Sequence, residues 1–135
     1  MNCGFVFGIL TEDGEIDMER NTELVELAQP IPCSMHRAFD RTNNLEISLR
    51  NIEICGFSTL LTSGMAKNVD SGIDNLKNLV QLSKHVEVMP GGGLRSSNIA
   101  KIKEMSQANW FHSSAIVSGE ICDVEEVSKL KEKLN

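Results

Sequence analysis

Four short polar motifs hold the side chains of this 135-residue sequence that are best suited to chemistry, and each follows a short apolar run. They are Met35-His36-Arg37-Ala38-Phe39-Asp40, Leu61-Thr62-Ser63-Gly64, Met89-Pro90-Gly91-Gly92-Gly93 and Phe111-His112-Ser113-Ser114-Ala115. Imidazoles and sulfur atoms bind copper or zinc, whereas arginine, hydroxyls and the N–H groups of a glycine turn bind anions. The motifs therefore indicate a metal site, an anion site, or both.

The candidate metal ligands are His36, His112 and Cys33. Side chains alternate along a strand, so His36 and Arg37 point to opposite faces; we expect His36 on the inner face, with His112 on an adjacent strand at a comparable depth. Two such imidazoles bind copper, zinc or a substrate, and a hydrogen-bonded core histidine is the alternative of equal weight. Cys33 and Met35 share the opposite face, where packing under helices is favoured over Cu(I) ligation.

The candidate anion-binding residues are Arg37, Gly91, Gly92, Gly93, Ser113 and Ser114. A glycine run before a helix can cradle a phosphate with its N–H groups, and the equal alternative is a tight turn that needs positive φ. For Arg37, an ion pair with Asp40 that fixes the loop ranks slightly ahead of anion binding. Hydroxyls of Thr62 and Ser63 would supplement an anion site or cap helices.

Short β-rich runs alternate with segments of helical period, which predicts βα units around a parallel sheet in a single domain spanning residues 1–135. Asp17 is the expected N-cap of the first helix, and Gly56 suits the end of the second. The pattern alone permits an open doubly wound sheet or a barrel. The expected strands span residues 4–10, 31–39, 57–62, 86–89 and 110–114, and the expected helices span 18–28, 45–54, 72–83, 97–105 and 124–134.

Composition excludes several classes of protein. Hydrophobic residues make up 41% and charged residues 24%, typical of a globular domain, and no apolar run approaches the roughly 20 residues of a bilayer span. A net charge of −6 argues against nucleic acid as a partner. The four widely spaced cysteines argue against a zinc ribbon, and residues 1–4 lack the basic start of a signal peptide. We therefore expect the cytoplasm, with the nucleus as a second location.

The four motifs, together with Phe7-Gly8-Ile9-Leu10-Thr11-Glu12-Asp13-Gly14-Glu15-Ile16-Asp17, resemble the CutC family in their order and spacing. The resemblance runs from Gly4 to Ala115 and resumes in the last helix. It implies a TIM (β/α)8 barrel and a link to copper tolerance and copper binding. Because the match starts at the family's fourth strand, we expect a partial barrel of about five βα units, as a truncated isoform or fragment. Its two open sheet edges predict a homo-oligomer.

Two functions follow from these observations. The resemblance favours a copper homeostasis protein that binds copper, as Cu(I), for buffering or trafficking without turnover. The alternative is a TIM-barrel enzyme that acts on a small phosphorylated or otherwise anionic substrate, with an indirect link to copper. No Ser/His/Asp order, P-loop or HExxH motif is present, so no catalytic residue is assigned.

Overall fold

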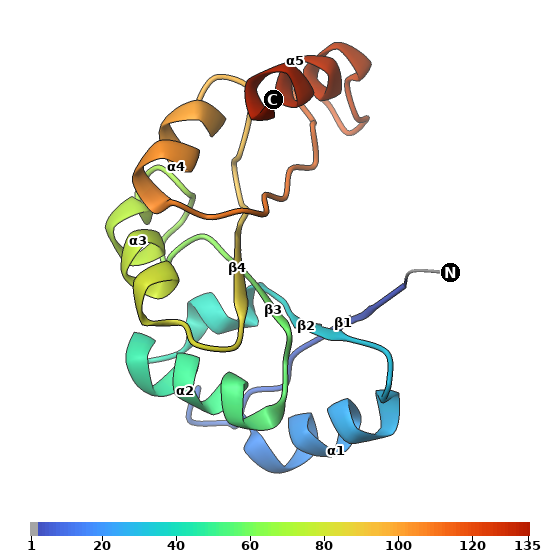
Figure 1. The fold of residues 1–135 in the computed structure, drawn as a ribbon, viewed down its shortest axis with the longest axis vertical. Coiled ribbons are helices and arrows are strands. Elements are labelled where there is room, and N and C mark those ends of the chain that lie inside the picture. The colour runs from blue at the N-terminus through green and yellow to red at the C-terminus, as the bar shows by residue number, and fades with distance from the viewer. Residues whose placement is uncertain (1–2) are drawn as a thin grey trace.

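A computed structural model describes residues 3–135 as an arc of βα units (Figure 1). Met1 and Asn2 lie outside the described residues. They begin the segment from which we predicted that no signal peptide is present. The sheet is parallel throughout, and each strand pairs with the next one along the chain. Its strands are β1 (Phe5–Phe7), β2 (Cys33–Met35), β3 (Thr59–Thr62) and β4 (Glu87–Pro90).

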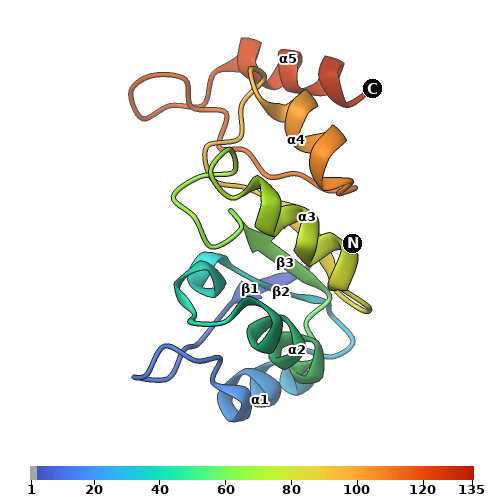
Figure 2. The ribbon, with the colours of Figure 1, turned by 90° about the vertical axis from the view of Figure 1, so that its left-hand side faces the viewer.

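The helices cover one face of this sheet, and Figure 2 looks onto them with the strands behind. Asp17 caps the first helix as expected, since its carboxylate accepts the N–H of Arg20, and Gly56 ends the second at φ +93°. Among residues 3–135, no helix has both the length and the apolar character to cross a membrane. The helices are α1 (Met18–Ala28), α2 (Leu45–Cys55), α3 (Ile73–Leu82), α4 (Ile99–Ser106) and α5 (Val124–Leu134).

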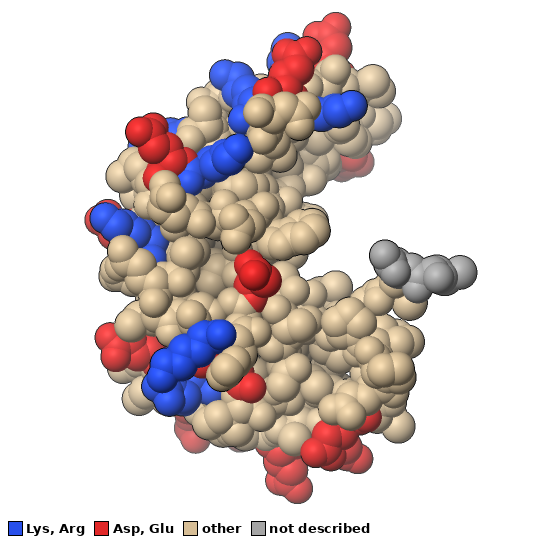
Figure 3. Space-filling view, in the orientation of Figure 1, with Lys and Arg blue, Asp and Glu red and all other residues tan. Residues whose placement is uncertain are grey.

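The two faces of the sheet differ in burial because side chains alternate along each strand. One ladder row, Phe7, Met35, Leu60 and Val88, packs into the core under the helices. The next row, Val6, Ser34, Thr59 and Glu87, lies on the opposite face and is partly or fully exposed. This opposite face, the inner face of the sheet, lines the concave side of the arc, and Figure 3 shows that side open.

Three predicted strands are corrected by the structure. The first, predicted over residues 4–10, ends at Phe7, and Leu10 forms only an isolated antiparallel bridge with Ile16. β2 ends at Met35, and a 3-10 helix, η1 (Arg37–Arg41), follows it with His36 as N-cap, so the prediction of a strand to residue 39 is wrong. The predicted strand at 110–114 is only a single parallel bridge between Gly91 and His112. The Ser113 hydroxyl, which accepts the N–H of Ala115 and donates to the carbonyl of Leu94, turns the chain away from the ladder there.

A buried carboxylate holds α5 against the start of α4. Glu126 accepts hydrogen bonds from the backbone N–H of Ser96 at 2.6 Å and from its hydroxyl at 2.7 Å. The Ser96 N–H, and then its hydroxyl, lower the pKa of Glu126 below its ordinary value of 4.5. The contact is therefore made by the charged form.

A lowered pKa in the folded state makes stability depend on pH in a defined direction. The stabilisation by the Glu126 carboxylate is present above the pKa that Glu126 has in the unfolded chain. It is lost as pH falls through the lower pKa that Glu126 has in the folded protein. We expect Glu126→Gln to reduce the thermal stability at neutral pH, and we expect the difference in melting temperature from the parent protein to shrink as pH falls below the ordinary glutamate pKa of 4.5. Thermal unfolding followed by circular dichroism across this range measures the gap; a constant gap would contradict the role of the charge.

Candidate functional site at the carboxyl ends of the strands

A nearly buried carboxylate, Asp40, organises the carboxyl ends of β2 and β3. It accepts the Nε–H of Arg37 at 2.9 Å and the N–H groups of Ser63 and Met65 at 3.1 and 3.0 Å. The hydroxyls of Thr62 and Ser63 also contact it. The predicted ion pair between Arg37 and Asp40 is thus confirmed, and it ties η1 to the loop after β3.

The guanidinium of Arg37 lies flat against the glycine turn after β4. Its Nη2 donates to the hydroxyl of Ser63 at 2.8 Å, while a Cβ at Gly92 would lie 2.7 Å from its Nη1. Gly92 also has φ +104°, so glycine is needed there for its conformation and for the space it leaves. Within residues 3–135, Nη1 has no hydrogen-bond partner, and its two N–H donors remain available to an anion.

The predicted anion-binding residues fall into two groups. Gly91 is not available to an anion through its N–H, which donates to the carbonyl of Thr62 at 2.9 Å. Ser113 and Ser114 lie beside a different cation, Arg95, whose Nη2 donates to the hydroxyl of Ser114 at 3.2 Å. The serines therefore brace the loop after the bridge at His112, and Arg37 with Gly92 and Gly93 forms the better candidate.

Arg95 is a cation at the carboxyl ends of the strands that the sequence prediction missed. Its Nε donates to the carbonyl of Ile116 at 2.8 Å, and its Nη1 donates to the carbonyl of Leu94 at 2.6 Å. Its position two residues after Gly93, before a helix, was the available signal.

His36 follows Met35 directly after β2, and its ring has a structural contact. Its Nδ1 accepts the N–H of Ala38 at 3.2 Å and so caps η1. A pocket of about 410 Å³ opens beside it, with Glu12 and Arg41 among its lining residues. The pocket carries charges of both signs, so it does not by itself select a cation or an anion.

The three predicted metal ligands do not form one site in this chain. His112 is exposed and pairs with Gly91 beyond β4; β3 and β4 separate it from His36, so the prediction of adjacent strands is wrong. Cys33 is 1% exposed in the core under the helices, and burial raises the pKa of its thiol. Across residues 3–135, no three His, Cys, Asp or Glu side chains are grouped to hold a metal ion.

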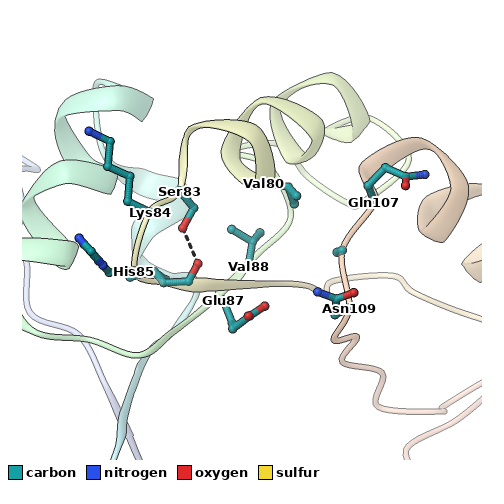
Figure 4. A pocket seen from close by; sticks show the side chains of 10 residues that line it. Val80, Ser83, Lys84, His85, Glu87, Val88, Gln107 and Asn109 are labelled. Carbon is teal, nitrogen blue, oxygen red and sulfur yellow. Dashed lines mark hydrogen bonds between the residues drawn. The ribbon is translucent and has the colours of Figure 1, made fainter.

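A separate pocket of about 280 Å³ lies at the amino end of β4, away from these loops (Figure 4). Glu87, Asn109 and the exposed His85 are among its lining residues. Beside it, Glu53 accepts the N–H groups of Lys84 and His85 at 2.7 and 3.1 Å. Burial raises the pKa of Glu53, but these two donors outweigh it and leave the pKa lowered. The contacts mark a structural clamp at the start of β4.

Residues 2–117 match the model of the CutC family. The chain is 42% identical over 113 residues to the mouse "Copper homeostasis protein cutC homolog" and 41% identical to the human protein of that name, covering 83% of this chain and 42% and 41% of those proteins. The Caenorhabditis elegans homolog is 33% identical over 130 residues, which cover 96% of this chain and 52% of that protein.

A solved structure of the putative copper homeostasis protein CutC from Streptococcus agalactiae superposes with a TM-score of 0.74 at 28% identity. The match covers 79% of this chain and 53% of that one, so this chain spans about half the length of the relatives it matches. The parallel sheet in sequence order, with helices on its outer face, is accordingly part of a TIM barrel. The match of the family model over most of the sequence shows that this chain belongs to the CutC family.

Proposed function

We propose that this chain acts in copper homeostasis by binding copper, as Cu(I), in the cytoplasm for buffering or trafficking. The observation that carries the proposal is the family match over residues 2–117, together with the names of the mouse and human relatives. The sequence adds two imidazoles, His36 and His112, and imidazole nitrogen is a good copper ligand.

The two histidines differ in how readily they would take up copper. His112 is exposed, and its ring has no hydrogen-bond partner among the described residues, so its nitrogens are accessible. His36 accepts the N–H of Ala38 at Nδ1, which places the proton of its neutral ring on Nε2. Copper at His36 would therefore compete with the cap of η1. We infer that His112 is the readier ligand.

A titration with Cu(I) under anaerobic conditions, against a competing chelator, tests this assignment. We expect His112→Ala to weaken copper binding by roughly tenfold or more, because it removes the accessible nitrogen ligand, and His36→Ala to have a smaller effect, because β3 and β4 separate it from His112. His85→Ala is the matched control, since its ring is exposed at the amino end of β4, and it should bind like the parent chain. Cys33→Ser should also leave binding unchanged, because the thiol is buried on the other face.

A second function has a specific observation in its favour, namely the Nη1 of Arg37, which lies beside Gly92 and has no hydrogen-bond partner among the described residues. It is the binding or turnover of a small phosphorylated or otherwise anionic substrate at the carboxyl ends of the strands, where TIM barrels place their active sites. Inorganic phosphate added to the same protein distinguishes the two functions. Thermal stabilisation by phosphate that Arg37→Gln abolishes, with no saturable uptake of Cu(I), would favour the anion and overturn the copper proposal.

A further inference from the structure

Met89 places a thioether on the inner face of the sheet, close to His112. Side chains alternate along β4, and Figure 4 shows Glu87 and Val88 on opposite sides of the strand. Val88 packs into the core under the helices, so Met89 lies with Glu87 on the inner face. Its ladder partner, Leu61, shares that face, and both side chains are half-buried. The thioether of Met89 therefore lies on the concave side of the arc.

His112 lies on the same face as Met89. It pairs with Gly91, which follows Met89 by two residues. A Cβ built on Gly91 would lie 3.0 Å from the Cβ of His112 and 2.5 Å from Cδ1 of Leu61, so these side chains leave the backbone on one side. Neighbouring parallel strands lie about 4.8 Å apart and two residues rise by about 6.6 Å, so the Cα atoms of Met89 and His112 are roughly 8 Å apart.

The space between Met89 and His112 suits a single ion. Gly91 stands between them in the register and has no side chain to fill that space. Leu61 borders it from β3 with apolar atoms. Long side chains on one face of neighbouring strands reach such diagonal neighbours, so the sulfur of Met89 and a ring nitrogen of His112 can contact the same ion.

The two ligand atoms favour Cu(I). A thioether is a soft, polarisable ligand that prefers Cu(I), and imidazole suits copper in general. Cu(I) binds readily to a pair of such ligands, so Met89 and His112 suffice although no three His, Cys, Asp or Glu side chains are grouped within residues 3–135. Arg37 stays outside this space, because its guanidinium meets a Cβ built on Gly92 and not one built on Gly91.

We propose that Met89 is the second ligand of a copper ion held by His112. The proposal rests on the copper-binding function proposed above and names the ligands that this function would use. It leaves out His36, which β3 and β4 separate from His112. It also attributes the preference for Cu(I) to the thioether.

Anaerobic titration with Cu(I) against a competing chelator tests the ligand pair. The background for this test is Cys3→Ser/Cys122→Ser, which removes the two exposed thiols. We expect Met89→Leu to weaken Cu(I) binding by roughly tenfold or more, because it removes the sulfur and keeps the apolar volume. Met105→Leu is the matched control, since Met105 is exposed on α4, and it should bind like the background protein.

X-ray absorption at the copper edge of the loaded background protein does not depend on the folding of a Met89 variant. We expect sulfur and nitrogen in the copper shell, and quenching of the single tryptophan, Trp110, which precedes His112 by two residues. A copper shell without sulfur would overturn the role of Met89 and leave the copper function standing.

The same conclusion would follow if Met89→Leu kept its helical circular dichroism and bound Cu(I) like Met105→Leu. A background protein that takes up no Cu(I) would also overturn the role of Met89. A parent chain that takes up none would overturn the copper function as well.

Discussion

Replacing Asp40 with alanine should lower the free energy of unfolding by about 3 kcal/mol. The side chain of Asp40 is 7% exposed, and its removal leaves the N–H groups of Ser63 and Met65 without their acceptor. Arg37 also loses its counter-ion, although its 40% exposure allows water to compensate part of that loss. Urea denaturation of the two proteins measures the difference.

Asp13→Ala provides the control for this measurement. Asp13 is an exposed aspartate whose carboxylate takes no part in the network, so its loss should change stability by less than about 0.5 kcal/mol. Asp40→Asn keeps one acceptor oxygen, so its free energy of unfolding should lie between those of Asp13→Ala and Asp40→Ala. If Asp40→Ala were as stable as Asp13→Ala, Asp40 would not be the residue that holds η1 to the loop after β3.

Replacing Gly72 with alanine should cost about 3 kcal/mol or more, because the new atom meets backbone. A Cβ at Gly72 would lie 1.8 Å from the carbonyl oxygen of Ser63, and no rotamer change relieves that overlap. To make room, the loop after β3 must move, and Ser63 would then leave Asp40. Urea denaturation measures the loss of stability.

The matched control is the same substitution at Gly119. That residue has φ +70°, and nothing lies within 4 Å of a Cβ built there, so Gly119→Ala carries only the cost of left-handed backbone, about 1 kcal/mol. Equal stabilities of the two variants would show that residues 63 and 72 can separate without penalty, contrary to the close contact between their backbones.

Local patterns were sufficient to predict the helices. α1 and α5 begin and end where the sequence predicted, since a capping aspartate, at 17 and 123, precedes each apolar face. The end of β2 was not predictable in this way. η1 forms because Asp40 meets donors that lie 22 to 25 residues further along the chain, and no local period records such contacts.

The sequence was sufficient to predict which residues belong to the candidate site, but not which of them lie together. The Arg37 and Asp40 pair follows from their spacing of three residues, and the glycine turn follows from its composition. The assignment of Ser113 and Ser114 to Arg95 instead of Arg37 depends on how far apart the loops lie around the arc. That distance is set by strand pairing and curvature, which the sequence does not show directly.

The order of the strands also bears on how the chain forms during synthesis. Because β1, β2, β3 and β4 are neighbours in sequence order, each unit that leaves the ribosome finds its docking surface already made by the unit before it. Contacts between successive units are short in sequence separation, which favours rapid folding. A fold of this kind grows from one end, and units can be gained or lost at either end without rethreading the units that remain.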